Sequence, residues 1–104
     1  MIRINVIIKD NNYKQITFKG HANYEDYGKD IVCASVSATY LCTINAILSI
    51  NSKTIKVTQE KDINIVDIIE NDKITIKLLD NMLNCLKSIE QQYPKNINIK
   101  SKEE

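Results

Sequence analysis

One short stretch of the sequence collects the side chains that could carry covalent chemistry. Residues 20–37 contain the only histidine, His21, both glycines, Gly20 and Gly28, and one of the three cysteines, Cys33. A cysteine thiolate is a nucleophile, and a histidine within reach can take the proton of the thiol. The residue types in this stretch therefore indicate a Cys–His pair suited to acyl transfer.

The residues around the cysteine predict how it is placed. Asp30 has the character of a helix N-cap, because a carboxylate there can accept a hydrogen bond from the free N–H groups of the first turn. A helix that begins at Ile31 puts Cys33 in that turn, where these N–H groups and the helix dipole favour the thiolate. Asp30 could instead orient His21, but capping requires no rearrangement of the loop. Ser37 follows one turn later, and its hydroxyl either approaches the thiol or bonds back to a helix carbonyl.

Each of these features also has a purely structural interpretation. A lone histidine at a strand end is often satisfied locally, a cysteine on a helix often fills the core, and glycines are common in turns. The loop of residues 22–29 is either a solvated connection or a mobile flap with Gly20 and Gly28 as hinges. In a flap, Tyr24 and Tyr27 could contact apolar side chains of a peptide substrate. The residue types alone leave these alternatives open.

The same stretch resembles the ribosomal-processing cysteine proteases of the Prp family. The resemblance rests on the following segments: Gly20-His21-Ala22, Gly28, Asp30–Ala34 and Val36-Ser37. Ser35 stands where family members usually carry a second alanine after the cysteine. The resemblance implies that Cys33 is the nucleophile and His21 the general base, and that Asp30 and Ser37 are supporting residues beside them.

The resemblance also implies a substrate. Prp proteases are endopeptidases that remove an N-terminal extension from the large-subunit ribosomal protein numbered twenty-seven during bacterial ribosome maturation. They cut after paired aromatic residues and before a small one, use no metal or organic cofactor, and are typically homodimers. The alternative is a non-catalytic binding module in ribosome assembly, in which the same loop and sheet hold a ribosomal protein or RNA. In that alternative Cys33 is merely a buried thiol.

Composition sets limits on the class of protein. The length of 104 residues suits one domain spanning residues 1–104. The formal net charge is +1 and acidic residues lie among the lysines, so we expect no direct binding of nucleic acid. We find no signal peptide and expect no apolar run of membrane-spanning length, and hence no membrane contact. Three widely spaced cysteines argue against a disulfide framework or a zinc site, so we expect a cytoplasmic protein.

The periodicity of apolar residues predicts the elements that position this stretch. Alternation predicts two strands, at 2–9 and 15–19, that form a hairpin. A helical pattern follows from Asp30 to about Ser49, with this apolar face: Cys33, Val36, Ser37, Tyr40, Leu41, Ile44, Ile47 and Leu48. Two further strands, a helix capped at Asn71-Asp72 and a last strand near 97–99 complete the order ββαββαβ. That order predicts a two-layer α/β (α+β) sandwich of two helices on a mostly antiparallel five-stranded sheet. Cys42 is predicted to be structural, on the side of the helix opposite Cys33, and Cys85 to pack within the apolar stripe of the second helix.

Overall fold

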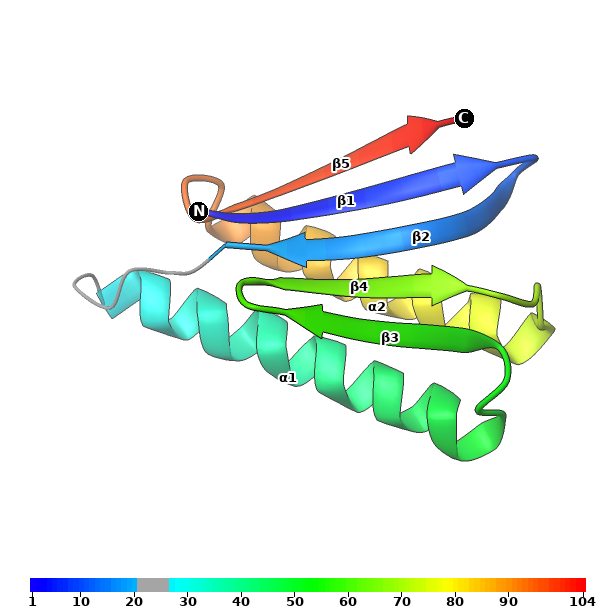
Figure 1. Cartoon of the computed structure of the whole chain (residues 1–104). Coiled ribbons are helices and arrows are strands. Elements are labelled where there is room, and N and C mark those ends of the chain that lie inside the picture. Colours follow the sequence, from blue (N-terminus) through cyan, green and yellow to red (C-terminus); the bar gives the residue numbers. More distant parts are fainter. Residues whose placement is uncertain (21–26) are drawn as a thin grey trace.

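In the part of the chain that it describes, the computed structural model has five strands and two helices arranged in two layers (Figure 1). The elements are β1 (Ile2–Lys9), β2 (Asn12–Lys19), α1 (Tyr27–Ile50), β3 (Ile55–Glu60), β4 (Ile63–Ile68), α2 (Lys73–Gln92) and β5 (Ile97–Glu103). The structure describes residues 1–20 and 27–104, and of residues 27–30 it describes only the helical backbone. The predicted order ββαββαβ is confirmed.

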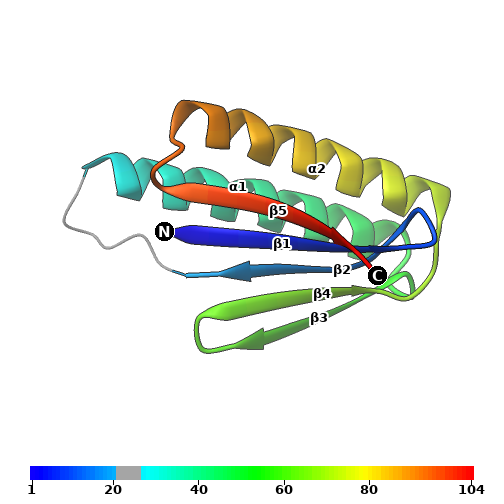
Figure 2. The ribbon, with the colours of Figure 1, turned by 90° about the horizontal axis from the view of Figure 1, so that it is seen from above.

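The sheet combines three antiparallel strand pairs with one parallel pair. Its strands follow the order β3-β4-β2-β1-β5, so β3 and β5 form the two edges. β1 and β5 run parallel, with Ile4 opposite Ile99, whereas the other neighbours are antiparallel. Both helices cover the same face of the sheet and leave the other face open (Figure 2). The prediction of a mostly antiparallel sheet under two helices is confirmed.

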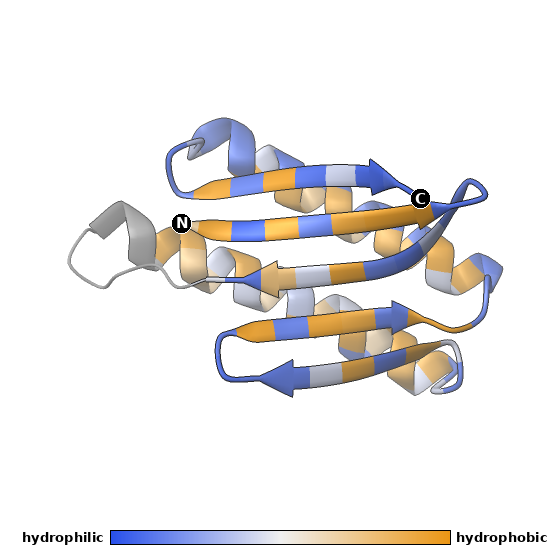
Figure 3. Cartoon of the chain, turned by 45° about the horizontal axis from the view of Figure 1, so that its top comes forward, coloured by the Kyte–Doolittle hydropathy of each residue, from blue (hydrophilic) through white to orange (hydrophobic). Residues whose placement is uncertain are grey.

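The core lies between the sheet and the helix layer. Along β1, Ile2, Ile4 and Val6 are buried while Arg3 and Asn5 are exposed, and this alternation is visible in Figure 3. The helices contribute the following buried side chains: Val32, Val36, Tyr40, Ile44 and Ile47 from α1, and Leu79, Met82, Leu83 and Leu86 from α2. The α2 set follows the three- and four-residue spacing of one helix face, as expected for an amphipathic helix.

The first helix begins earlier than predicted. α1 starts at Tyr27, so Asp30 lies inside the helix and the prediction that it is the N-cap is wrong. Cys33 consequently falls in the second turn, beyond the N–H groups that a helix leaves free at its start. Gly28 is also helical rather than part of a loop that extends to Lys29. The Asp-Ile-Val sequence gave a local capping signal, but the helix continues through it.

The predicted absence of a membrane-length apolar run is also wrong. The segment Ile31–Ile50 has 20 residues with a mean hydropathy of 1.8, enough by length and composition to cross a membrane. In the fold, Val32, Val36 and Ile44 of this segment are buried in the core, although only 22% of its apolar window lies inside the structure. Leu41 and Leu48, which were predicted to lie on the buried face, are exposed. Because α1 is apolar around much of its circumference, periodicity could not identify the packed face.

The second helix is anchored by a small polar network at its start. Asp72 is the N-cap, as predicted, and its Oδ2 accepts a hydrogen bond from the Thr75 amide at 3.0 Å. The Thr75 hydroxyl lies 2.8 Å from the hydroxyl of Thr54, just before β3, and both threonines are buried. The Thr54 hydroxyl in turn donates to the Asn51 carbonyl. The network therefore ties the start of α2 to the turn between α1 and β3.

Replacing Asp72 tests this anchor. Asp72→Ala removes the acceptor of the Thr75 amide and should lower the free energy of unfolding by about 1 kcal/mol. Urea denaturation of the purified protein measures the change. Asp72→Asn keeps an oxygen acceptor at the cap and should lose clearly less. Equal losses in the two variants would mean that the carboxylate charge, and not the capping hydrogen bond, stabilises α2.

Candidate active site

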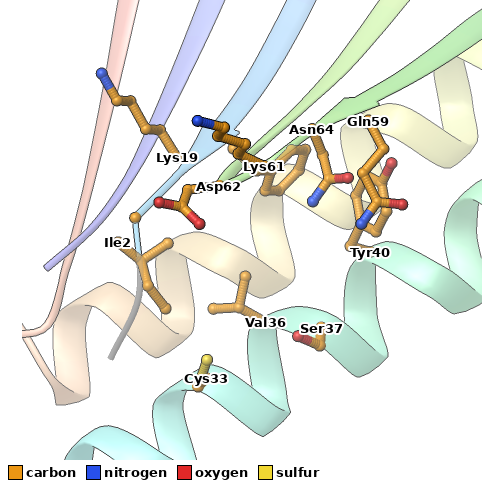
Figure 4. A pocket seen from close by; sticks show the side chains of 12 residues that line it. Ile2, Lys19, Cys33, Val36, Ser37, Tyr40, Gln59, Lys61, Asp62 and Asn64 are labelled. Atoms are coloured by element: carbon orange, nitrogen blue, oxygen red, sulfur yellow. The ribbon is translucent and has the colours of Figure 1, made fainter. Parts of the chain in front are cut away.

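The ends of several elements meet at one end of the sheet and enclose a cavity of about 280 Å³ (Figure 4). The cavity is lined by Ile2, Phe18, Lys19 and Gly20 from the β1–β2 side, by Cys33, Val36, Ser37 and Tyr40 from α1, and by Gln59, Lys61, Asp62 and Asn64 from the β3–β4 hairpin. One wall is therefore a helix face, and the other is the end of the sheet. A peptide could enter between them.

Cys33 presents its thiol to this cavity from the side of α1. The residue is half-buried and packs partly against the core, and Figure 4 shows its side chain near Val36 and Ser37. A rigid helix holds the thiol in place while one side of it stays accessible. The alternative in which Cys33 is only a buried structural thiol does not fit this position.

Ser37 lies one helical turn after Cys33 and lines the same cavity. The alternative interpretation, a hydroxyl bonded back to a helix carbonyl, applies to its neighbours instead. Ser35 donates to the Ile31 carbonyl and Thr39 to the Ser35 carbonyl, each at 2.8 Å. Within the described part of the chain, Ser37 makes no such bond. Its hydroxyl is thus available to groups that enter the cavity.

Gly20 marks the point where the chain leaves β2. Its φ is +105°, and a side chain there would collide with the Met1 carbonyl. Its amide donates a hydrogen bond to the Asp62 carbonyl at 3.3 Å. Only glycine fits this backbone position. Gly20, which lines the cavity, is followed in the sequence by His21, the predicted base.

Several predicted site residues fall outside what the structure describes. His21 and Tyr24 lie outside the described residues, and so do the side chains of Tyr27 and Asp30. The structure thus brings together Gly20, Cys33 and Ser37. The base, the flap and the tyrosine contacts stay predictions.

The cavity also contains residues that the sequence analysis did not assign to it. No function was predicted for the β3–β4 hairpin. It contributes Gln59, Lys61, Asp62 and Asn64 to the cavity. Tyr40 was predicted only as a residue of the helix face. Its ring meets Phe18 edge-on with centroids 4.7 Å apart, and burial raises the pKa of its hydroxyl above the usual value.

The three cysteines differ in their surroundings. All three are free, but Cys42 and Cys85 are exposed, so the prediction that Cys85 packs within the apolar stripe of α2 is wrong. Cys85 lies beside the buried stripe of α2, next to Leu86, rather than within it. Of the three thiols, only that of Cys33 lines the cavity. The position of Cys33 therefore distinguishes it chemically from the other two.

Comparison with known proteins gives a consistent result. The family model described as cysteine protease Prp matches residues 1–98. The ribosomal processing cysteine protease Prp of Staphylococcus aureus (strain Mu50 / ATCC 700699) is 32% identical over 108 residues, which cover 98% of this chain and 100% of that protein.

Solved structures agree with the sequence comparison. An essential ribosomal processing protease Prp from S. aureus, crystallised with a substrate peptide, matches with a TM-score of 0.89 and 27% identity over 98% of this chain and all of that one. The complex of that protease with a covalently linked product peptide matches with a TM-score of 0.88, 28% identity and the same coverage. SMU.848 from Streptococcus mutans, at 23% identity, shares the fold with a TM-score of 0.88 over 100% of this chain and 96% of that one.

The likeness first seen in residues 20–37 thus extends over the whole fold and nearly the whole sequence. The relatives are named as cysteine proteases, and Cys33 is the cysteine that lines the cavity described above. The chain belongs to the Prp family of cysteine proteases.

Proposed function

We propose that the protein is an endopeptidase that removes the N-terminal extension of the large-subunit ribosomal protein numbered twenty-seven during bacterial ribosome maturation. The observation that carries the proposal is the half-buried thiol of Cys33 on the wall of a cavity large enough for part of a peptide. The names of the similar S. aureus proteins, which specify ribosomal processing, support the substrate class. The family resemblance supports the particular ribosomal protein.

In the proposed mechanism His21 takes the proton of the Cys33 thiol, and the sulfur attacks the scissile carbonyl carbon. The resulting tetrahedral intermediate collapses as the C–N bond breaks, and His21 gives its proton to the leaving amine. Water, with its proton taken by His21, then hydrolyses the thioester and restores the thiol. The exposed Ser37 hydroxyl, one turn from Cys33, can donate a hydrogen bond to the thiolate or to the developing oxyanion.

We also propose that the protein acts as a cytoplasmic homodimer through the outer face of α1. Leu41 and Leu48, two helical turns apart on one side of α1, are exposed, with Leu41 53% accessible. No charged residue occurs in the segment Ile31–Ile50, so two copies can approach around a twofold axis without charge repulsion. Exposed apolar stripes of this kind mark interaction surfaces. In the reducing cytoplasm the three free cysteines stay reduced.

The nucleophile can be tested by removing each cysteine in turn. Cys33→Ala should abolish cleavage of a synthetic peptide that carries paired aromatic residues followed by a small one, and the far-ultraviolet circular dichroism spectrum should stay unchanged. Cys42→Ala and Cys85→Ala are matched controls, since both thiols are exposed, and should cleave at the rate of the unmodified protein. Normal cleavage by Cys33→Ala would refute the proposed mechanism.

The base can be tested with His21→Ala. Loss of general-base assistance should lower kcat by about a hundredfold or more. Alkylation of Cys33 by iodoacetamide near neutral pH should also slow, because the imidazole no longer helps to hold the thiolate. If both the turnover and the alkylation rate stayed unchanged, His21 and Cys33 would not act as a pair.

The dimer can be tested by placing a charge on α1. Leu41→Lys should shift the mass measured by light scattering from dimer to monomer, because a buried unpaired charge opposes association. Ile74→Lys changes an equally exposed apolar residue on α2 and should leave the dimer intact. A Leu41→Lys protein that stays dimeric would exclude this face as the interface.

A further inference from the structure

One row of residues across the sheet changes character at the cavity. In the pairing register, Ile4 on β1 lies opposite Phe18 on β2, Phe18 opposite Asn64 on β4, and Asn64 opposite Gln59 on β3. Ile4 and Phe18 are buried beneath the helices, so this row faces the helix layer. The next row on this face of the sheet, two residues further along β1, is apolar throughout. It consists of Val6, Ile16, Val66 and Val57. Two carboxamides therefore stand where the sheet would otherwise continue its apolar face.

The two carboxamides face the cavity without partners of their own. Neither Gln59 nor Asn64 forms a side-chain hydrogen bond to any residue that the structure describes, although each carboxamide has two donor hydrogens and an acceptor oxygen. Asn64 is half-buried, so its amide belongs to the wall of the cavity, whereas Gln59 is exposed and lies at the rim. Figure 4 shows both side chains near Tyr40, with Val36 and Ser37 between them and Cys33.

A half-buried polar group without a partner, such as the Asn64 amide, favours a ligand that supplies the missing hydrogen bonds. A sheltered donor or acceptor loses part of its hydration, and a bonded ligand restores that loss. Apolar side chains of a substrate cannot do this. The peptide main chain can, since every residue other than proline offers one N–H and one C=O.

We propose that Asn64 and Gln59 are positioning residues that bind the main chain of the extended substrate peptide on one side of the scissile bond. This inference rests on the proposed function. Side chains directly opposite each other on neighbouring strands lie about 5 Å apart, and an extended peptide advances about 3.3 Å per residue. Each carboxamide can therefore donate to a carbonyl and accept from an N–H of nearby substrate residues. Such contacts select for an extended backbone rather than for particular side chains.

Steady-state kinetics separate a positioning role from a catalytic one. Asn64→Leu and Gln59→Leu keep a side chain of similar size but remove the amide, and each should raise KM for the aromatic-containing synthetic peptide by about five- to tenfold with little change in kcat. Asn5→Leu on β1 is the matched control. Asn5 is exposed and its row faces the open side of the sheet, so this variant should keep the original KM.

Binding of backbone-modified peptides shows whether main-chain atoms are the partners. In a Cys33→Ala background, replacing successive peptide amides by esters removes one N–H at a time. At one or two positions the ester should weaken binding by about five- to tenfold, and this loss should vanish in the Asn64→Leu or Gln59→Leu protein.

The outcomes are distinguishable. A protein with all its side chains intact that fails to cleave the peptide refutes the proposed function itself. Cleavage with an unchanged KM in both leucine variants overturns the inference, and so does a fall in kcat alone. If either leucine variant fails to fold, the ester peptides decide alone. Equal binding of all of them to the Cys33→Ala protein would also overturn the inference.

Discussion

The contact between Phe18 and Tyr40 sets the spacing on which the cavity depends. The two rings meet edge-on at 4.7 Å between centroids and join β2 to α1 where the apolar core gives way to the cavity. Aromatic pairs in this geometry contribute beyond the area that they bury. Val32 and Val36 are buried one position before Cys33 and Ser37 along the same helix. The packing that buries the valines therefore also orients the thiol and the hydroxyl toward the cavity.

Patterns among residues close in sequence predicted much of this fold. They failed where the structure depends on contacts between residues far apart in the sequence. The alternation in β1 and the Asp72 cap depend on neighbouring residues, and both are found as predicted. The start of α1 was predicted too late because aspartate is a favoured N-cap residue, and Asp30 therefore marked a helix start that the structure places at Tyr27. Leu41 was assigned to the core because α1 is apolar on several sides, and only the tertiary fold decides which of them is covered.

The candidate site divides in the same way. Gly20, Cys33 and Ser37 lie in one continuous motif, so their spacing was visible in the sequence. Asn64 and Gln59 reach the cavity through strand register, which the sequence does not display. In β4, Asn64 and Val66, and not the isoleucines at 63 and 65, oppose the buried Phe18 and Ile16. A polar residue inside an apolar row becomes conspicuous only when the row is known.

The parallel pairing of β1 with β5 has a consequence for how the protein folds. Ile2 pairs with Ile97, and the Ile2 amide donates to the Asn96 carbonyl, so these contacts close almost the entire chain into one loop. β1 and β2 can form their hairpin quickly, but the cost in chain entropy of recruiting β5 precedes any gain from its pairing. Until β5 arrives, β1 presents an open, isoleucine-rich edge of the kind that pairs with other chains. The step that completes the sheet is therefore also the step that protects it from aggregation.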